Sequence, residues 1–224
     1  MIMNLLMRVT CLILLTVTLV AVHAVEIDRS ALLQDTLKMS SKNDDMTAVC
    51  WISEEIFSAG KPQPPAGTTT QREQFLKSVR PYIMIMVLES TMDASGNFTY
   101  KSEKYLRANT RLIDSQGNSY APRPETEELK SVTQLIEPAF AEMIGPRGKN
   151  MHLLFFPAKT DRGVPIARPT SKGEFKVKLA DNEFRWRLPL DSFLPHKVCS
   201  GCGEEGKGSW TFCPWCGLIL SQKQ

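Results

Sequence analysis

Signatures of catalysis are missing from this chain of 224 residues. It contains no G-x-S-x-G nucleophile motif, no glycine-rich loop that would cradle a phosphate and no H-E-x-x-H helix. Histidine, the usual acid–base group near neutral pH, is scarce, and only His152 and His196 follow residue 24. Acidic pairs such as Glu54 and Glu55 are neighbours on one element, so nothing places two carboxylates across a cleft. We therefore expect a protein that is not an enzyme.

A strong net charge, an internal repeat and a long low-complexity tract are also absent. The 27 basic and 24 acidic residues leave a formal charge of +3, which is too small to indicate nucleic acid as a partner. Hydrophobic residues make up 42% and charged residues 23% of the chain, as in an ordinary globular protein. The length is enough for one medium domain with an appendage.

The apolar run near the N-terminus is too short to span a membrane as a helix. Residues 9–22 form an uncharged run of 14 residues, whereas a spanning helix needs about 20. Arg8 precedes the run and the small residue Ala24 follows it, which is typical of a secretory signal peptide over residues 1–24. The alternative is a single uncleaved N-terminal anchor with the domain outside. Either way we expect an exported chain, periplasmic or secreted, and no nucleic-acid partner.

Cysteine is sparse as well, but four of the six cysteines gather near the C-terminus. Two C-x-x-C pairs, ten residues apart, supply Cys199, Cys202, Cys213 and Cys216. Paired thiolates at this spacing provide the tetrahedral ligand set of a zinc ion. Gly203 and Gly217 follow the pairs, where a tight turn favours a positive φ, and Pro214 fixes φ within the second pair. The sequence therefore predicts Zn²⁺ as cofactor, and it predicts Cys50 to be a small buried residue.

This segment resembles a short zinc ribbon, in which two such cysteine knuckles lie on the turns of small β-hairpins. The resemblance covers residues 196–224 and implies a structural zinc ion. Two alternatives use the same cysteines. Cys213 and Cys216 enclose Pro-Trp, as in a thioredoxin-type dithiol, which would make the chain a thiol-redox or metal-handling protein. Two structural disulfides are the other alternative in an exported chain. The second glycine-flanked pair favours metal over both.

Between the signal peptide and the cysteines we expect a tether or a weakly packed helix over residues 25–45, where Leu32, Leu33 and Leu37 could line one face, and a β-rich globular domain over residues 46–195. Continuous apolar runs at 82–88 and 151–156 predict buried strands, and residues 105–113 predict another strand. Ser53 is expected to cap a helix ahead of two glutamates. Thr70 and Glu73 form a capping-box pattern, which predicts a helix that stops before Pro81.

A longer amphipathic helix is predicted over residues 125–143, with a kink or break at Pro138. Its apolar positions recur at steps of three and four residues: Leu129, Val132, Ile136, Phe140 and Met143. The hairpin over residues 112–120 resembles, locally, those of immunoglobulin-like sandwiches in exported proteins. Together these patterns predict an α+β or mainly β fold, an antiparallel sandwich-like core with two or three helices, plus a small C-terminal zinc ribbon.

Residues 175–188 show the clearest alternation of apolar and charged residues, which predicts an antiparallel hairpin with one wet face. Only cations lie on the wet face, and we call them the cationic hairpin face: Lys176, Lys178, Arg185 and Arg187. These cations could contact an anionic surface or an acidic partner. The simpler interpretation is a solvated face that is relieved by Glu174, Asp181 and Glu183. Overall we expect an exported binding or assembly protein whose partner is an envelope or extracellular protein.

Overall fold

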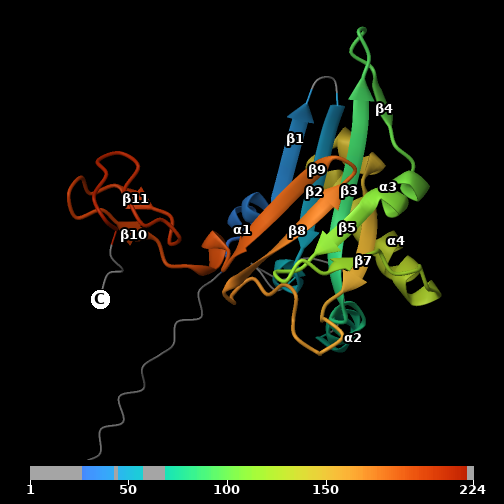
Figure 1. Ribbon diagram of the computed structural model, residues 1–224. Coiled ribbons are helices and arrows are strands. Elements are labelled where there is room, and N and C mark those ends of the chain that lie inside the picture. Colours follow the sequence, from blue (N-terminus) through green and yellow to red (C-terminus); the bar gives the residue numbers. More distant parts are fainter. Residues whose placement is uncertain (1–26, 43–44, 58–68, 221–224) are drawn as a thin grey trace, which may run out of the picture.

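The computed structural model of the chain describes residues 27–42, 45–57 and 69–220. Two antiparallel sheets pack face to face, and a long helix covers the outer face of one of them (Figure 1). This confirms the α+β fold with an antiparallel sandwich-like core, and neither sheet closes into a barrel. The predicted signal peptide lies outside the described residues. Among the residues that are described, no helix is long and apolar enough to cross a bilayer.

The first sheet is five-stranded and centres on β3 (Tyr82–Met92). β3 pairs with β2 (Asp45–Ile52), with β4 (Phe98–Tyr100) and with β7 (His152–Pro157), and β1 (Leu37–Lys42) extends the sheet beyond β2. Residues 47–52, 83–88 and 153–156 are buried without a break. The reason is that both faces of these strands are covered, one by the second sheet and the other by helix. The continuous apolar runs are therefore strands of the central layer, as predicted.

The second sheet has the strand order β6-β5-β8-β9. Its strands are β5 (Thr110–Ile113), β6 (Ser119–Tyr120), β8 (Gly173–Leu179) and β9 (Asn182–Leu188). β8 and β9 alternate between buried and accessible residues, because one face packs on the first sheet and the other meets solvent. Phe175 stacks on Trp186 with 5.0 Å between ring centroids and meets Trp51 edge-on at 4.9 Å. These rings join the two sheets at the centre of the core.

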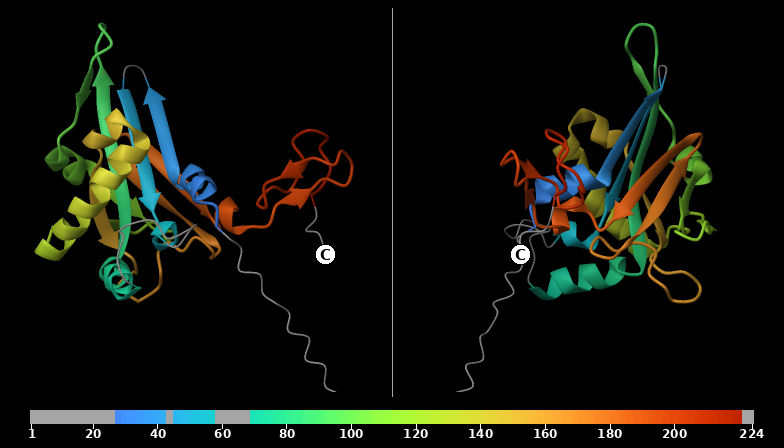
Figure 2. Two further views of the ribbon diagram at one scale, coloured as in Figure 1. Left: turned by 180° about the vertical axis from the view of Figure 1, so that it is seen from behind. Right: turned by 60° about the vertical axis from the view of Figure 1, so that its left-hand side comes forward.

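The outer helix α4 (Glu127–Ile144) runs across the face of the first sheet that is turned away from the second sheet (Figure 2). Leu129, Val132, Ile136 and Phe140 are buried as predicted, while the side chain of Met143 lies outside the described part. The helix continues through Pro138 as one element. Glu137 accepts a hydrogen bond of 2.9 Å from the Leu153 amide, which satisfies a donor on the free edge of β7.

The remaining helical elements are shorter. α2 (Thr69–Val79) is the predicted helix that ends before Pro81, but it begins at Thr69, so Thr70 lies within the helix and not at the N-cap of a capping box. The 3₁₀ turns are η1 (Glu54–Phe57), η2 (Pro146–Asn150) and η3 (Asp191–Phe193). Ser53 precedes η1 but does not cap it, because its buried hydroxyl has no hydrogen-bond partner among the described residues. The predicted capping role of Ser53 is therefore wrong.

Of the two expectations for residues 25–45, the structure shows a helix rather than a tether. Helix α1 (Arg29–Thr36) and strand β1 occupy most of that range, and Leu32 and Thr36 are fully buried. The indole Nε1 of Trp186 donates a 3.1 Å hydrogen bond to the Thr36 carbonyl. Few apolar residues mark this stretch, so its packing against the second sheet is not visible from its own composition.

The predicted strand over residues 105–113 is a strand only at its end. Residues 103–109 form helix α3 (Glu103–Asn109), and β5 begins at Thr110. The Ser102 hydroxyl caps the helix by accepting from the Tyr105 amide, and Arg107 pairs with Glu103 one turn earlier at 2.7 Å. These local bonds outweigh the β-propensity of the aromatic and aliphatic residues in the segment.

Candidate metal centre

Residues 196–220, which we call the cysteine module, form two small hairpins beside the sandwich (Figures 1 and 2). In the first, β10 (Lys197–Val198) pairs with β11 (Glu205–Gly206). In the second, Phe212 bridges to Ile219, and the Leu220 amide donates to the Thr211 carbonyl at 2.9 Å. The cysteines lie on the turns of these hairpins, as the resemblance to a zinc ribbon implies.

The two cysteine knuckles have the same backbone geometry. In each, the amide of the trailing glycine donates to the carbonyl of the leading cysteine at 2.9 Å: Gly203 to Cys199, and Gly217 to Cys213. Both glycines have a φ of 76°, a region that residues with a Cβ adopt at a cost. The leading cysteines are buried and the trailing ones are exposed. The predicted role of the two glycines is confirmed, and the repeated geometry aims four sulfurs at one point.

All four sulfurs lie within 4.8 Å of one another. Cys199 Sγ is 3.4 Å from Cys216 Sγ, and Cys202 Sγ is 3.5 Å from Cys213 Sγ, so each of these contacts joins one knuckle to the other. A tetrahedral zinc ion with bonds of about 2.3 Å would hold its sulfurs roughly 3.8 Å apart. A disulfide would need about 2.05 Å, and all five described cysteines are free thiols. The donor set thus fits one metal ion.

The electrostatics of the cluster also favour a cation. Amide hydrogen bonds from Cys202 and Gly201 lower the pKa of the Cys199 thiol to about 6. For Cys202 the Glu204 amide acts in the same direction, but burial and hydrogen bonds to the other thiols raise its pKa to about 12. The Leu218 amide acts to lower the pKa of Cys216. Hydrogen bonds to the thiols of Cys199 and Cys213 act the other way and outweigh it, so the net shift is upward. One thiolate therefore forms easily, and further negative sulfurs require a positive ion among them.

Little apolar packing supports the module. Its buried cluster consists of Cys199, Cys213 and Leu220, with Trp210 packed against them, and it is separate from the core of the sandwich. Trp210 therefore covers the buried side of the cysteine cluster. Trp215 does not, because 61% of it is exposed, with its ring 6.1 Å from that of Trp210. The module contains too few buried side chains to fix its fold by packing alone.

Asp191 of η3 connects the module to the sandwich. Its carboxylate accepts from the Ser209 amide at 3.0 Å and lies 3.7 Å from the Lys207 ammonium. η3 is itself tied to α1, since the Ser192 amide donates to Asp35 at 2.7 Å. Few direct bonds thus join the two cores.

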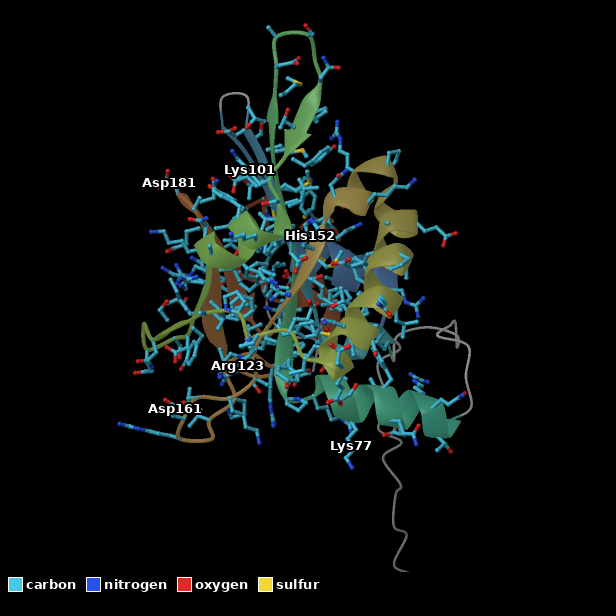
Figure 3. The ribbon with its side chains drawn as sticks, turned by 90° about the vertical axis from the view of Figure 1, so that its right-hand side faces the viewer. Lys77, Lys101, Arg123, His152, Asp161 and Asp181 are labelled. Carbon is cyan, nitrogen blue, oxygen red and sulfur yellow. The ribbon has the colours of Figure 1, made fainter. Side chains whose placement is uncertain are left out.

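Other candidate residues have other surroundings. His196 is exposed and lies 3.8 Å from Glu205 rather than among the sulfurs. Cys50 is buried in the sandwich as predicted, and burial raises its pKa to about 12. His152 lies 4.0 Å from Glu137 at the edge of the first sheet (Figure 3).

On the cationic hairpin face, acids on the same hairpin pair with two of the four cations. Lys176 contacts Glu183 at 2.7 Å, and Arg185 pairs with Glu174. Arg111 of β5 lies opposite Lys178 in the register and extends the face, which the sequence did not reveal because strand order is not local. The face is therefore a mixed, solvated surface rather than a purely cationic one.

Comparison with protein-family models, with curated proteins and with solved structures finds no match to this chain. The fold and the site by themselves define an antiparallel α+β sandwich protein with a C-terminal four-cysteine module that can hold a metal ion.

Proposed function

We propose that the chain is an exported, non-enzymatic binding or assembly protein, in which the sandwich is the scaffold and the cysteine module is a zinc-organised contact surface. An envelope or extracellular protein is the partner. The proposal of export rests on the signal-peptide pattern of residues 1–24. The proposal of a contact surface rests on where large apolar side chains meet solvent.

Exposed apolar side chains are concentrated on the cysteine module. Of the nine large hydrophobic residues that are exposed in the described part of the chain, five belong to this small module: Val198, Phe212, Trp215, Leu218 and Ile219. Four of the five lie within or next to the second knuckle. Apolar groups gathered on one surface mark interaction sites, whereas single exposed residues elsewhere are ordinary. This concentration is the observation that carries the proposal.

Zinc is the metal that the donor set favours. Four thiolates without an open position are the ligand set of a structural zinc site. The thiol-redox alternative draws support from the lowered pKa of Cys199, which gives a thiolate near neutral pH. A dithiol of that kind closes a disulfide within one C-x-x-C pair, however, and here the short sulfur contacts join different pairs.

The metal and redox functions differ in what the purified protein contains. The zinc proposal predicts about one zinc ion per chain by elemental analysis and four thiols that react slowly until the metal is removed. Cysteines that cycle between thiol and disulfide with a dithiol reductant, in a protein without zinc, would establish the redox alternative instead.

The contact surface is tested by crosslinking in the host envelope. A photoreactive residue at Leu218 should capture one reproducible partner, and the double variant Phe212→Ser, Ile219→Ser should abolish capture while zinc binding persists. The matched control is Met39→Ser, which removes a side chain that is 59% exposed on the sandwich, against 58% for Phe212. Equal capture by the double variant and the control would refute the contact role.

A further inference from the structure

A cavity opens at the end of the sandwich, and no residue of the cysteine module lines it. It has a volume of about 870 Å³, within the range of small-molecule sites. Its walls come from the end of β2, the start of β3 and residues 157–170, which form part of the connection from β7 in the first sheet to β8 in the second. Trp51, Ile83 and Met84 line it but are at most 4% exposed, so the accessible apolar part of the wall comes from residues such as Pro81, Pro157 and Pro165.

Cations that the fold leaves unpaired line this cavity. Arg123, Lys159 and Arg168 have no side-chain hydrogen bond or ion pair with any residue that the structure describes, and all three are accessible to solvent. Figure 3 shows Arg123 close to the loop that carries Asp161. A second hollow of about 1030 Å³ shares Arg123, Pro157 and Pro165 with the first, so Arg123 lies at the wall between them.

The acids of the cavity do not neutralise these cations. Glu54 is already bound to Arg80 at 2.8 Å, which leaves Glu55 as the one lining carboxylate without a partner in the described chain. Three unpaired cations and one unpaired acid leave the lining with an excess of positive charge, and a bound anion would reduce that excess.

The wall also contains an unsatisfied buried hydroxyl. Ser53 lines the cavity and is 4% exposed, and its Oγ has no partner among the described residues. Buried polar atoms are nearly always hydrogen-bonded, and an orphan of this kind requires an explanation. The Oγ itself has almost no accessible surface, so a ligand in the cavity would reach it only after a small movement of the wall.

We propose that this cavity binds an organic anion, with a carboxylate or phosphate held by Arg123, Lys159 and Arg168 and an apolar portion against Pro81, Pro157 and Pro165. Guanidinium groups bind either oxyanion well, since their paired N–H donors match two oxygens at once. The apolar wall selects for a ligand that also has a hydrocarbon part.

Calorimetric titration of the purified protein tests this with four probes: octanoate, octyl phosphate, inorganic phosphate and the neutral octyl glucoside. We expect at least one of the two octyl anions to bind saturably at one site, more tightly than inorganic phosphate, and the neutral probe not to bind. The head group of the tighter octyl anion identifies the chemistry. Equal binding of the neutral probe, or no binding of either octyl anion, would overturn the proposal.

Variants locate the binding site. Arg123→Gln combined with Arg168→Gln should weaken the octyl anion by about tenfold to a hundredfold, the loss expected for charge-assisted hydrogen bonds. The matched control is Arg187→Gln, an exposed arginine on β9 outside the cavity, which should bind as the wild type does. The backbone bond from the Arg123 amide to Phe155 is retained in the variant. Wild-type affinity in the double variant would place the site elsewhere and refute the assignment.

Ser53→Ala separates a ligand contact from a structural defect. Removing an unpartnered buried hydroxyl should leave the melting temperature unchanged or raise it. Weaker anion binding at unchanged stability would support contact of the ligand with Ser53. Unchanged binding in this variant would overturn the place given to the hydroxyl.

Discussion

Removing the zinc ion that we propose for the cysteine module should unfold that module and leave the two sheets folded. The buried cluster of the module contains one aliphatic side chain, Leu220, whose burial contributes about 1.5–3 kcal/mol. A structural zinc ion contributes about 10–16 kcal/mol of binding free energy near neutral pH. The metal term is several times larger, so packing cannot replace it. The sandwich has its own large core and does not share this dependence.

Hydrogen exchange measured by mass spectrometry is the assay, with a zinc chelator added under reducing conditions so that the thiols do not oxidise. Peptides from residues 197–220 should exchange rapidly after chelation, because the amides of Cys199, Gly203, Cys213 and Gly217 lose their hydrogen bonds. Peptides from β3 should stay protected. Cys202→Ser should behave like the chelated protein. The control is Ser200→Ala, which changes the same knuckle at a position that supplies no ligand, and it should behave like the wild type. Protection that survives metal removal would refute the reasoning, and loss of protection in β3 would show that the two cores are coupled.

Three further predictions concern the sandwich. Leu32→Ala should lower the free energy of unfolding in urea by about 2–5 kcal/mol, since it opens a cavity under α1; a loss below about 0.5 kcal/mol would restore the idea of a tether. Because burial raises the pKa of Cys50 to about 12, its thiolate at pH 8 is roughly one part in ten thousand. Cys50 should therefore resist alkylation in the native protein and react once it is denatured. Burial also raises the pKa of Glu137 in the folded state above 4.5, so the folded protein binds that proton more tightly and loses stability as the pH rises from 4.5. Glu137→Gln should thus melt at a higher temperature than the wild type at pH 7 and at the same temperature at pH 4, and a lower melting temperature at pH 7 would contradict this.

The sequence predicted those parts of the molecule whose signal is local. The cysteine spacing and the two glycines specify the knuckles, because each knuckle is built within five residues. The central strands were visible as unbroken apolar runs, and the β8–β9 hairpin as alternation, since burial on two faces or one face is written directly into the residue order. Four of the five predicted apolar positions of α4 could be checked, and all four are buried.

The parts that could not be predicted depend on residues far apart in the chain. Thr36 is buried and its carbonyl accepts a hydrogen bond from Trp186, and nothing near residue 36 reveals that partner. The cation at position 111 joins the hairpin face only through the register of β5 with β8. The cavity likewise gathers Arg123, Lys159 and Arg168 from separate segments, each unremarkable by itself.

The bond between Trp186 and Thr36 spans 150 residues, and this separation governs when the chain can fold. A polypeptide that emerges N-terminus first exposes α1 and β1 long before β9 exists to cover them. Contacts of such long range form slowly, because the loop-closure entropy must be overcome before they stabilise anything. The sandwich therefore closes late, once nearly the whole domain has emerged. A chain with this connectivity stays open while it is being threaded through a pore, which suits the export that its N-terminus predicts.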